Sequence, residues 1–181
     1  MKNALIISSS VVLLMWFVFL VDVIIPIDFA YFGIMPRTIS GLKGILFAPF
    51  LHADLGHIVS NSGAIFVLTF TLFWCYKNIA WRVWILSALS AGFLTWIFAR
   101  TSYHIGMSAV IFALLGFLLA IGIFKFSLKT LIISGIIFFL YGGVIFGVLP
   151  SDPRISWEGH LFGFISGIVI AKLNKKSVED F

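Results

Sequence analysis

The stretch HIGMSAVIFALLGF, residues 104–117, decides the fold because it opens an apolar run with no charged residue before Lys125. A run of this length predicts a helix inside a lipid bilayer, where an open backbone would find no hydrogen-bond partners. A single hydroxyl, that of Ser108, stands at the mouth of the run. Serine in a membrane helix often bonds back to its own helix or packs against a neighbour. Whether Ser108 packs or reacts depends on what surrounds it.

The composition of the whole chain requires lipid as the solvent. Its 181 residues are 61% hydrophobic and 10% charged, and the mean hydropathy is +1.15. A soluble domain of this size could not bury that much apolar surface. We expect one domain over residues 1–181. The net charge of +5 is spread singly along the chain, which indicates topology signals and no nucleic-acid partner. The lone Cys75 excludes an intrachain disulfide and a cysteine metal cluster.

The apolar stretches predict an all-α membrane protein, a polytopic bundle of six transmembrane helices. The six stretches cover about 4–26, 56–76, 80–99, 105–124, 130–149 and 157–173. We expect the first to be a retained span, because no small-residue cleavage site follows it. The segment 27–55 between the first two spans is aromatic and amphipathic and is broken by Pro36 and Pro49. This composition favours an interfacial first loop.

The distribution of basic residues predicts the orientation of the bundle. With both termini in the cytoplasm, twice as many basic residues lie inside as outside, which agrees with the positive-inside rule. The inner group is Lys2, Lys77, Arg82, Lys125, Lys129, Lys172, Lys175 and Lys176, and the outer group is Arg37, Lys43, Arg100 and Arg154. We therefore expect a multi-pass protein of the cell membrane whose second, fourth and sixth spans begin at the outer face.

Polar residues converge where these three spans begin. His57 and Asn61 open the second span, Ser108 the fourth and His160 the sixth. At a rise of about 1.5 Å per residue, Ser108 lies about 25 Å above Lys125, and His160 lies about 18 Å above the lysine at position 172. All four polar residues fall in the outer half of a bilayer core about 30 Å thick. Polar groups at that depth usually face the bundle interior or a water-filled cavity.

Small residues follow the same two spans and predict that they pack closely. In the sixth span Gly159, Gly163, Gly167 and Ala171 recur every four residues, and the fourth span carries Ala109, Ala113, Gly116 and Ala120. Such stripes let helix backbones approach each other. Packing alone explains the stripes, but it does not explain why a serine and a histidine stand at their matching ends.

A serine needs a base to act as a nucleophile at neutral pH, and histidine is the usual base. We expect His160 to be the base for Ser108, because it lies on a neighbouring helix held by glycines. His104 is expected to be exposed in the loop and poorly fixed. The free N–H of Ser108 at a helix N-terminus, with His57 and Asn61 four residues apart, would supply donors for an oxyanion.

The remaining polar residues argue against a catalytic acid and against a metal. Glu158 and Asp22 are acidic candidates for a third catalytic member, but neither position implies contact with His160, and we expect a Ser–His dyad. His52 and His57 are five residues apart, about 140° around a helix, which is poor for shared metal ligation. The chain lacks H-E-x-x-H. The sequence predicts neither a metal nor a cofactor.

Taken together, these motifs resemble those of the rhomboid family of intramembrane serine proteases. GMSA is similar to its G-x-S-G motif, GHLFG to its H-x-x-G, and HADLGHIVSN to its H-x(4)-H-x(3)-N segment. The stretch GIMPRTISGLKGILFAPFLH is similar to the first loop of one prokaryotic branch. The order of the motifs and the six-helix minimal form also match, over nearly the whole chain.

The resemblance implies roles for the residues that match. Ser108 would be the nucleophile and His160 the general base, while His57, Asn61 and the Ser108 N–H would bind the oxyanion. The supporting residues would be Gly106, Ala109, Phe112, Gly163 and His52. Among these, Ala109 stands where the family has glycine and Phe112 where it often has tyrosine. Near the place of the Trp-Arg pair common in the family's first loop, this chain has Gly44-Ile45.

Two functions follow from the resemblance. The first is an endopeptidase that cleaves single-span or polytopic membrane proteins in or near their transmembrane segments. The alternative is a non-catalytic protein of the same family that binds transmembrane clients. Such proteins typically lose the serine or the histidine, and this chain keeps both, so the sequence favours the enzyme.

Overall fold

The computed structural model describes residues 1–25, 27–150 and 155–179. Within them it shows helices joined by short segments, and the only β-type pairing is an isolated bridge between Ile34 and His104. The long helices are α1 (Lys2–Ile24), α3 (Leu55–Cys75), α4 (Ala80–Phe98), α5 (Ser108–Lys125), α6 (Leu128–Tyr141) and α7 (Trp157–Asn174). The predicted all-α polytopic bundle is confirmed. Pro26, at the end of the first predicted span, and Arg154, in the outer basic group, lie outside the described residues.

Five of the helical segments are long and apolar enough to cross a membrane. They are Lys2–Ile24, Leu55–Cys75, Ala80–Phe98, Ser108–Lys125 and Leu128–Val148. Helix α7 has 18 residues and is not among them. It carries Glu158 and His160 in its first turns, and Glu158 is buried in the bundle. Its polar residues are therefore accommodated by protein neighbours, as expected for ionisable groups at membrane depth.

The fifth predicted span, 130–149, divides into two kinds of helix. Regular α6 ends at Tyr141, and the chain continues as a tighter 3-10 helix, η4 (Gly142–Val148). The change falls at two consecutive glycines, Gly142 and Gly143, which have the poorest α-helix propensity after proline. Short 3-10 turns are common at the ends of α-helices, but a run of 7 residues is longer than usual.

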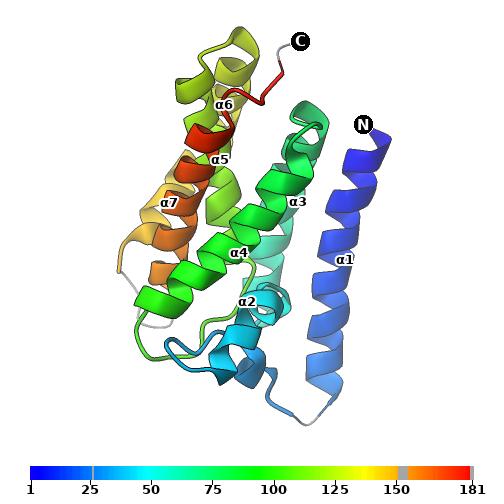
Figure 1. Cartoon of the computed structure of the whole chain (residues 1–181). Helices are drawn as coiled ribbons and strands as arrows, with labels where there is room; N and C mark the ends of the chain where they lie inside the picture. The colour runs from blue at the N-terminus through cyan, green and yellow to red at the C-terminus, as the bar shows by residue number, and fades with distance from the viewer. Residues whose placement is uncertain (26, 151–154, 180–181) are drawn as a thin grey trace.

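Helix α5 forms the centre of the bundle. Two thirds of its residues are buried (67%), whereas the buried residues of α6 are Thr130, Ile133 and Ile137 alone. Helix α7 packs along α5, and α1 packs against α3. Figure 1 shows that α3, α5 and α7 all begin at the same end of the bundle, the end opposite to the start of α1. The three polar helix starts identified in the sequence are therefore gathered at one end.

The long first loop is folded into short helices that lie at this same end (Figure 1). They are η1 (Phe29–Phe32), η2 (Ser40–Lys43), α2 (Gly44–Phe47) and η3 (Ala48–Phe50). Arg37 fastens the loop to the end of α4, because its guanidinium donates to the carbonyls of Ile97 (3.1 Å) and Ala99 (2.7 Å). A Cβ on Gly44 would collide with the backbone of Gly33, so the loop folds tightly on itself.

Candidate active site

The turn that leads into α5 is fixed by a glycine with an unusual backbone conformation. Gly106 has φ +110°, a region that side chains rarely adopt. A Cβ at this position would lie 2.6 Å from Nε2 of His57 and 3.6 Å from Nδ2 of Asn61. The start of α3 and the turn before Ser108 therefore touch, and only glycine permits the approach.

Two hydrogen-bond donors at this contact have no acceptor among the residues that the structure describes. Asn61 is 6% exposed, and its Nδ2 is buried without a hydrogen bond. The N–H of Ser108 lies in the first turn of α5, where the helix itself offers no acceptor. A buried unpaired donor costs free energy, so such a group in a native protein needs an explanation. An acceptor that arrives with a ligand would satisfy both.

His52 supports His57 from the first loop. The two rings meet edge to face with centroids 4.9 Å apart, and His52 Nδ1–H donates to the Phe50 carbonyl at 3.3 Å. Burial, and then the neighbouring His57, lower the pKa of His52 to about 4. His52 is therefore neutral near pH 7, and its ring packs against the His57 ring and supports it.

His160 is held on two sides. Its Nδ1 lies 2.8 Å from the carbonyl oxygen of Gly147 in η4, and its ring stacks on Phe112 of α5 with centroids 4.3 Å apart and planes 6° apart. A carbonyl only accepts, so Nδ1 of the neutral ring carries the proton. The free lone pair is then on Nε2, the tautomer that a general base requires. Phe112 lacks the hydroxyl of tyrosine but supplies the stacking face.

The small-residue stripes of α5 and α7 face each other, as predicted. Cβ atoms placed on Gly163 and Gly167 would collide with the carbonyl oxygens of Ala109 and Ala113. A Cβ on Gly159 would lie 3.6 Å from the Ala109 methyl, an ordinary van der Waals distance. The methyl group of Ala109 is therefore accommodated by the glycine opposite.

Ser108 and His160 are linked through this interface. Ala109, the residue after Ser108, lies against Gly159 and Gly163, which flank His160 in α7, and Phe112 stacks on the His160 ring. Within the described residues no hydrogen bond joins Ser108 to His160. The structure thus gathers His57, Asn61 and Gly106 at one contact and Ala109, Phe112, His160 and Gly163 at another, on either side of Ser108.

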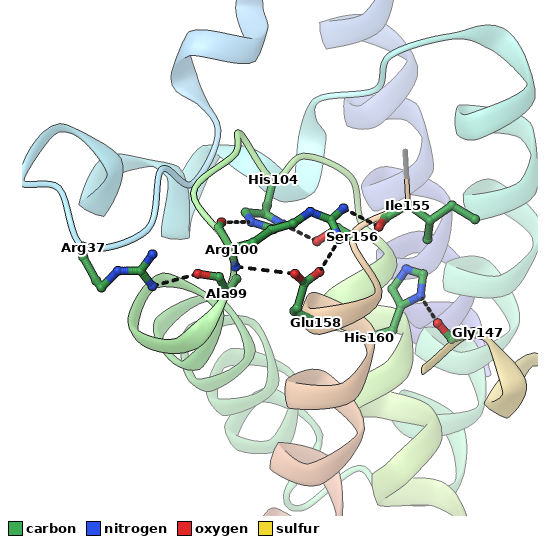
Figure 2. A network of polar contacts seen from close by, with 9 residues as sticks. All are labelled: Arg37, Ala99, Arg100, His104, Gly147, Ile155, Ser156, Glu158 and His160. Atoms are coloured by element: carbon green, nitrogen blue, oxygen red, sulfur yellow. Dashed lines mark hydrogen bonds and ion pairs between the residues drawn. The ribbon is translucent and has the colours of Figure 1, made fainter. Parts of the chain in front are cut away.

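The expectation that His104 is exposed and poorly fixed is wrong. His104 is 4% exposed. Its Nε2–H donates to the Arg100 carbonyl at 3.0 Å, so Nδ1 accepts from the Ser156 hydroxyl at 2.5 Å (Figure 2). Backbone bonds with Ile34 in both directions close the loop over it. Burial lowers the pKa of His104, which therefore serves as a neutral connector within the loop.

Neither acidic candidate bonds to His160. Glu158 forms an ion pair with Arg100, with Oε2 3.3 Å from Nη1, and Asp22 accepts from the Phe29 N–H at 3.3 Å. Sequence reasoning missed Gly147, because a backbone carbonyl has no signature in residue type. It also missed the Arg100–Glu158 pair, whose members are 58 residues apart. No group of three or more His, Cys, Asp or Glu side chains suited to a metal occurs in the described part of the chain.

Fold and composition together define a multi-pass, all-helical membrane protein. A family model described as the Rhomboid domain matches residues 40–176. The chain therefore belongs to the rhomboid family.

Similar proteins occur in mycobacteria and in a giant virus. An uncharacterized protein of Mycobacterium leprae is 38% identical over 152 residues, which are 78% of this chain and 59% of the relative. One of Mycobacterium tuberculosis is 34% identical over 154 residues, 78% of this chain and 62% of the relative. A putative rhomboid protein of Acanthamoeba polyphaga mimivirus is 31% identical over 154 residues, 80% of this chain and 84% of that protein. The matched region spans about three fifths of the length of the mycobacterial relatives.

Proposed function

We propose that this protein is an intramembrane serine endopeptidase that uses a dyad of Ser108 and His160. The observation that carries the proposal is how the His160 ring is hydrogen-bonded and stacked. Its Nδ1–H is engaged by the Gly147 carbonyl and its ring lies on Phe112, which leaves Nε2 as the base at the end of the bundle where Ser108 begins α5.

The reaction begins with proton transfer from Ser108 Oγ to His160 Nε2. The Oγ atom attacks the carbonyl carbon of a peptide bond, and the imidazolium then returns the proton to the leaving amine. The acyl-enzyme ester is hydrolysed by a water that His160 deprotonates in the same way. The Gly147 carbonyl orients the ring and stabilises its charged form, the task that a carboxylate performs in a triad. This assignment explains why neither acid reaches His160.

The oxyanion of the tetrahedral intermediate would accept hydrogen bonds from the N–H of Ser108 and from the side chains of Asn61 and His57. The unpaired Asn61 Nδ2 supports this role, because it is a buried donor without an acceptor in the resting protein. Preorganised donors of this kind stabilise charge only as it develops, and the loss of one typically costs about 100- to 1,000-fold in rate.

The surroundings of Ser108 favour a small side chain before the cleaved bond. A cavity of about 20 Å³ lies beside Ser108, between Ile45 of the loop, Gly92 of α4 and Gly159 of α7. That is room for about one water molecule. The substrate helix must also unwind to present a carbonyl, since helical hydrogen bonds shield it. Membrane proteins with glycine or proline near the outer end of a span are the expected substrates.

We propose that the site opens to the extracytoplasmic side of the cell membrane and that both ends of the chain lie in the cytoplasm, because this orientation agrees with the positive-inside rule. The arrangement of the helices agrees with this proposal, because α1 begins at the end of the bundle opposite to the starts of α3, α5 and α7 (Figure 1). The start of α1 and the site therefore lie at opposite ends of the bundle. The lipid bilayer and membrane-protein substrates are the partners, and the mechanism needs no metal and no cofactor.

The test is cleavage of a panel of single-span substrates by the purified protein in detergent. Wild type should cleave a subset, whereas Ser108→Ala and His160→Ala should each be inactive. The double variant should be no worse than either, because the pair acts as a unit. Ser102→Ala, in the exposed part of the same loop, is the matched control and should retain full activity. Tight binding of the panel without cleavage by wild type would instead indicate a client-binding protein.

A further inference from the structure

A polar clamp joins the loop before α5 to the first turn of α7. Arg100 donates from Nη2 to the Ile155 carbonyl at 2.8 Å and from its backbone N–H to Glu158 Oε1 at 3.4 Å. Its Nη1 lies 3.3 Å from Glu158 Oε2. His104 adds the contact with Ser156 (Figure 2). We call Arg100, His104, Ser156 and Glu158 the loop clamp.

The clamp buries a carboxylate. The Glu158 side chain is 6% exposed and that of Arg100 is 37% exposed. Removing a carboxylate from water is expensive, and a buried ion pair often contributes no more to stability than apolar residues of the same size. A geometric task would account for a charge in this position, because an ion pair with hydrogen bonds holds its members in one arrangement.

The clamp joins the two segments whose relative position determines catalysis. Loop 99–107 leads directly into Ser108, and Glu158 lies two residues before His160. We propose that Arg100 and Glu158 are positioning residues that set the distance from Ser108 Oγ to His160 Nε2. The proposal rests on the function proposed above and adds two residues that do not touch the substrate.

The packing of α7 on α5 gives such a clamp a task. The glycines of α7 place its backbone directly against the backbone of α5. The helices therefore come close, but few side chains interlock to prevent movement along the helix axis. The stacking of His160 on Phe112 likewise permits sliding parallel to the ring planes. A misplacement of about 1 Å can cost about 100-fold in rate. The directional contacts of Glu158 fix the start of α7 against such a shift.

Glu158 acts through position and not as a third catalytic member. Both of its oxygens are directed to Arg100, and Nδ1 of His160 is occupied by Gly147. Its loss should therefore lower the rate of chemistry and leave substrate binding almost unchanged. A residue that merely stabilised the fold would instead alter the melting temperature alone.

The test compares two contacts between the same pair of helices, at their opposite ends. Glu158→Ala removes the carboxylate of the loop clamp, and Arg82→Ala removes the bond from Arg82 Nη1 to Asn174 Oδ1 (3.4 Å) at the far end of α4 and α7. Each purified full-length variant is assayed for kcat, KM and melting temperature. A fluorophosphonate probe gives a fourth readout, since Ser108 Oγ attacks its phosphorus and fluoride leaves without any need for substrate docking.

Glu158→Ala should lower kcat and the labelling rate together by about 10- to 100-fold, with KM within about threefold. Glu158→Gln keeps the acceptor for the Arg100 N–H and should recover most of the loss. Arg82→Ala should change only the melting temperature. Wild-type kcat and labelling in Glu158→Ala, or equal losses in Arg82→Ala, would overturn the clamp.

Ser156→Ala tests the clamp without leaving a charge unpaired, should Glu158→Ala fail to fold. It removes the hydroxyl bound by His104 and should slow labelling by about three- to tenfold; an unchanged rate would refute the proposal. A wild-type protein that the probe does not label would count against the proposed function itself. Labelling that is equal in wild type and the clamp variants would count against the clamp alone.

Discussion

The two sides of His160 differ sharply in packing. On the α5 side the backbones touch, and Gly163 and Gly167 lie against the carbonyls of Ala109 and Ala113. On the η4 side the preceding helix is largely exposed, and Cβ atoms on Gly135 and Gly143 would meet nothing within 4 Å. The tight side sets how closely α7 lies against α5, whereas the loose side contributes the single carbonyl that fixes the tautomer of the imidazole. Position and protonation of one residue thus depend on elements of unequal rigidity.

The largest effect should come from the oxyanion donors of α3, which meet the turn that leads into α5 on the tight side. Asn61→Ala and His57→Ala should each lower kcat by about 10- to 1,000-fold without unfolding the protein, and the melting temperature of Asn61→Ala should not fall, because its unpaired amide is removed. Ser60→Ala is the control, because its exposed hydroxyl bonds only to the His57 carbonyl of its own helix (2.9 Å). Full activity in both donor variants would mean that α3 merely packs against the turn at Gly106.

The loose side is tested by Gly147→Ala. The new methyl would lie 2.9 Å from Cζ of Phe112 and 3.4 Å from Nδ1 of His160, so it should displace the ring by a few tenths of an ångström. We expect kcat to fall about tenfold. Gly143→Ala in the same 3-10 helix enters open space and should be neutral. Equal activity of the two variants would show that η4 does not hold His160.

The packing difference itself is tested by two identical substitutions. Gly167→Ala would collide with the Ala113 carbonyl and with the Phe117 amide nitrogen at 2.6 Å. Overpacking of this kind should lower the free energy of unfolding by about 1–3 kcal/mol. Gly135→Ala has free space and a better helix residue, and it should be neutral or stabilising by up to about 1 kcal/mol. Unfolding in mixed micelles measures both, and similar values would remove the distinction between the two sides.

The smallest effect is expected for Ala109→Gly. Because Gly159 accommodates the Ala109 methyl, cleavage should change by less than about tenfold, and stability should fall by up to about 1 kcal/mol. The assay is the same substrate panel, with wild type beside it. A gain above about 100-fold would show that the methyl displaces the dyad, and it would favour the client-binding function.

Sequence reasoning reached the helices and their contacts because both depend on local periodicity. Lipid forces apolar stretches into helices, and residues four apart share a face. The spacing of the small residues in α5 and α7 therefore predicted that these two helices pack against each other. The partners of His104 and Glu158 were not, because loop 99–107 and the start of α7 meet only in the folded bundle. The Gly147 carbonyl was beyond reach for a different reason. The direction of this carbonyl depends on the change from α-helix to 3-10 helix at Gly142. Residue types alone do not show where a backbone oxygen points.

The unpaired amide of Asn61 lowers the stability of the folded protein at a position that its function uses. A buried donor without an acceptor typically costs about 1–3 kcal/mol, which is a large part of the margin by which proteins stay folded. Selection for stability alone would replace Asn61 with an apolar residue, and natural proteins commonly break such rules where function requires it. The resting state of this protein is therefore less stable than its fold allows, and a ligand oxygen that reaches Nδ2 would recover part of that deficit on binding.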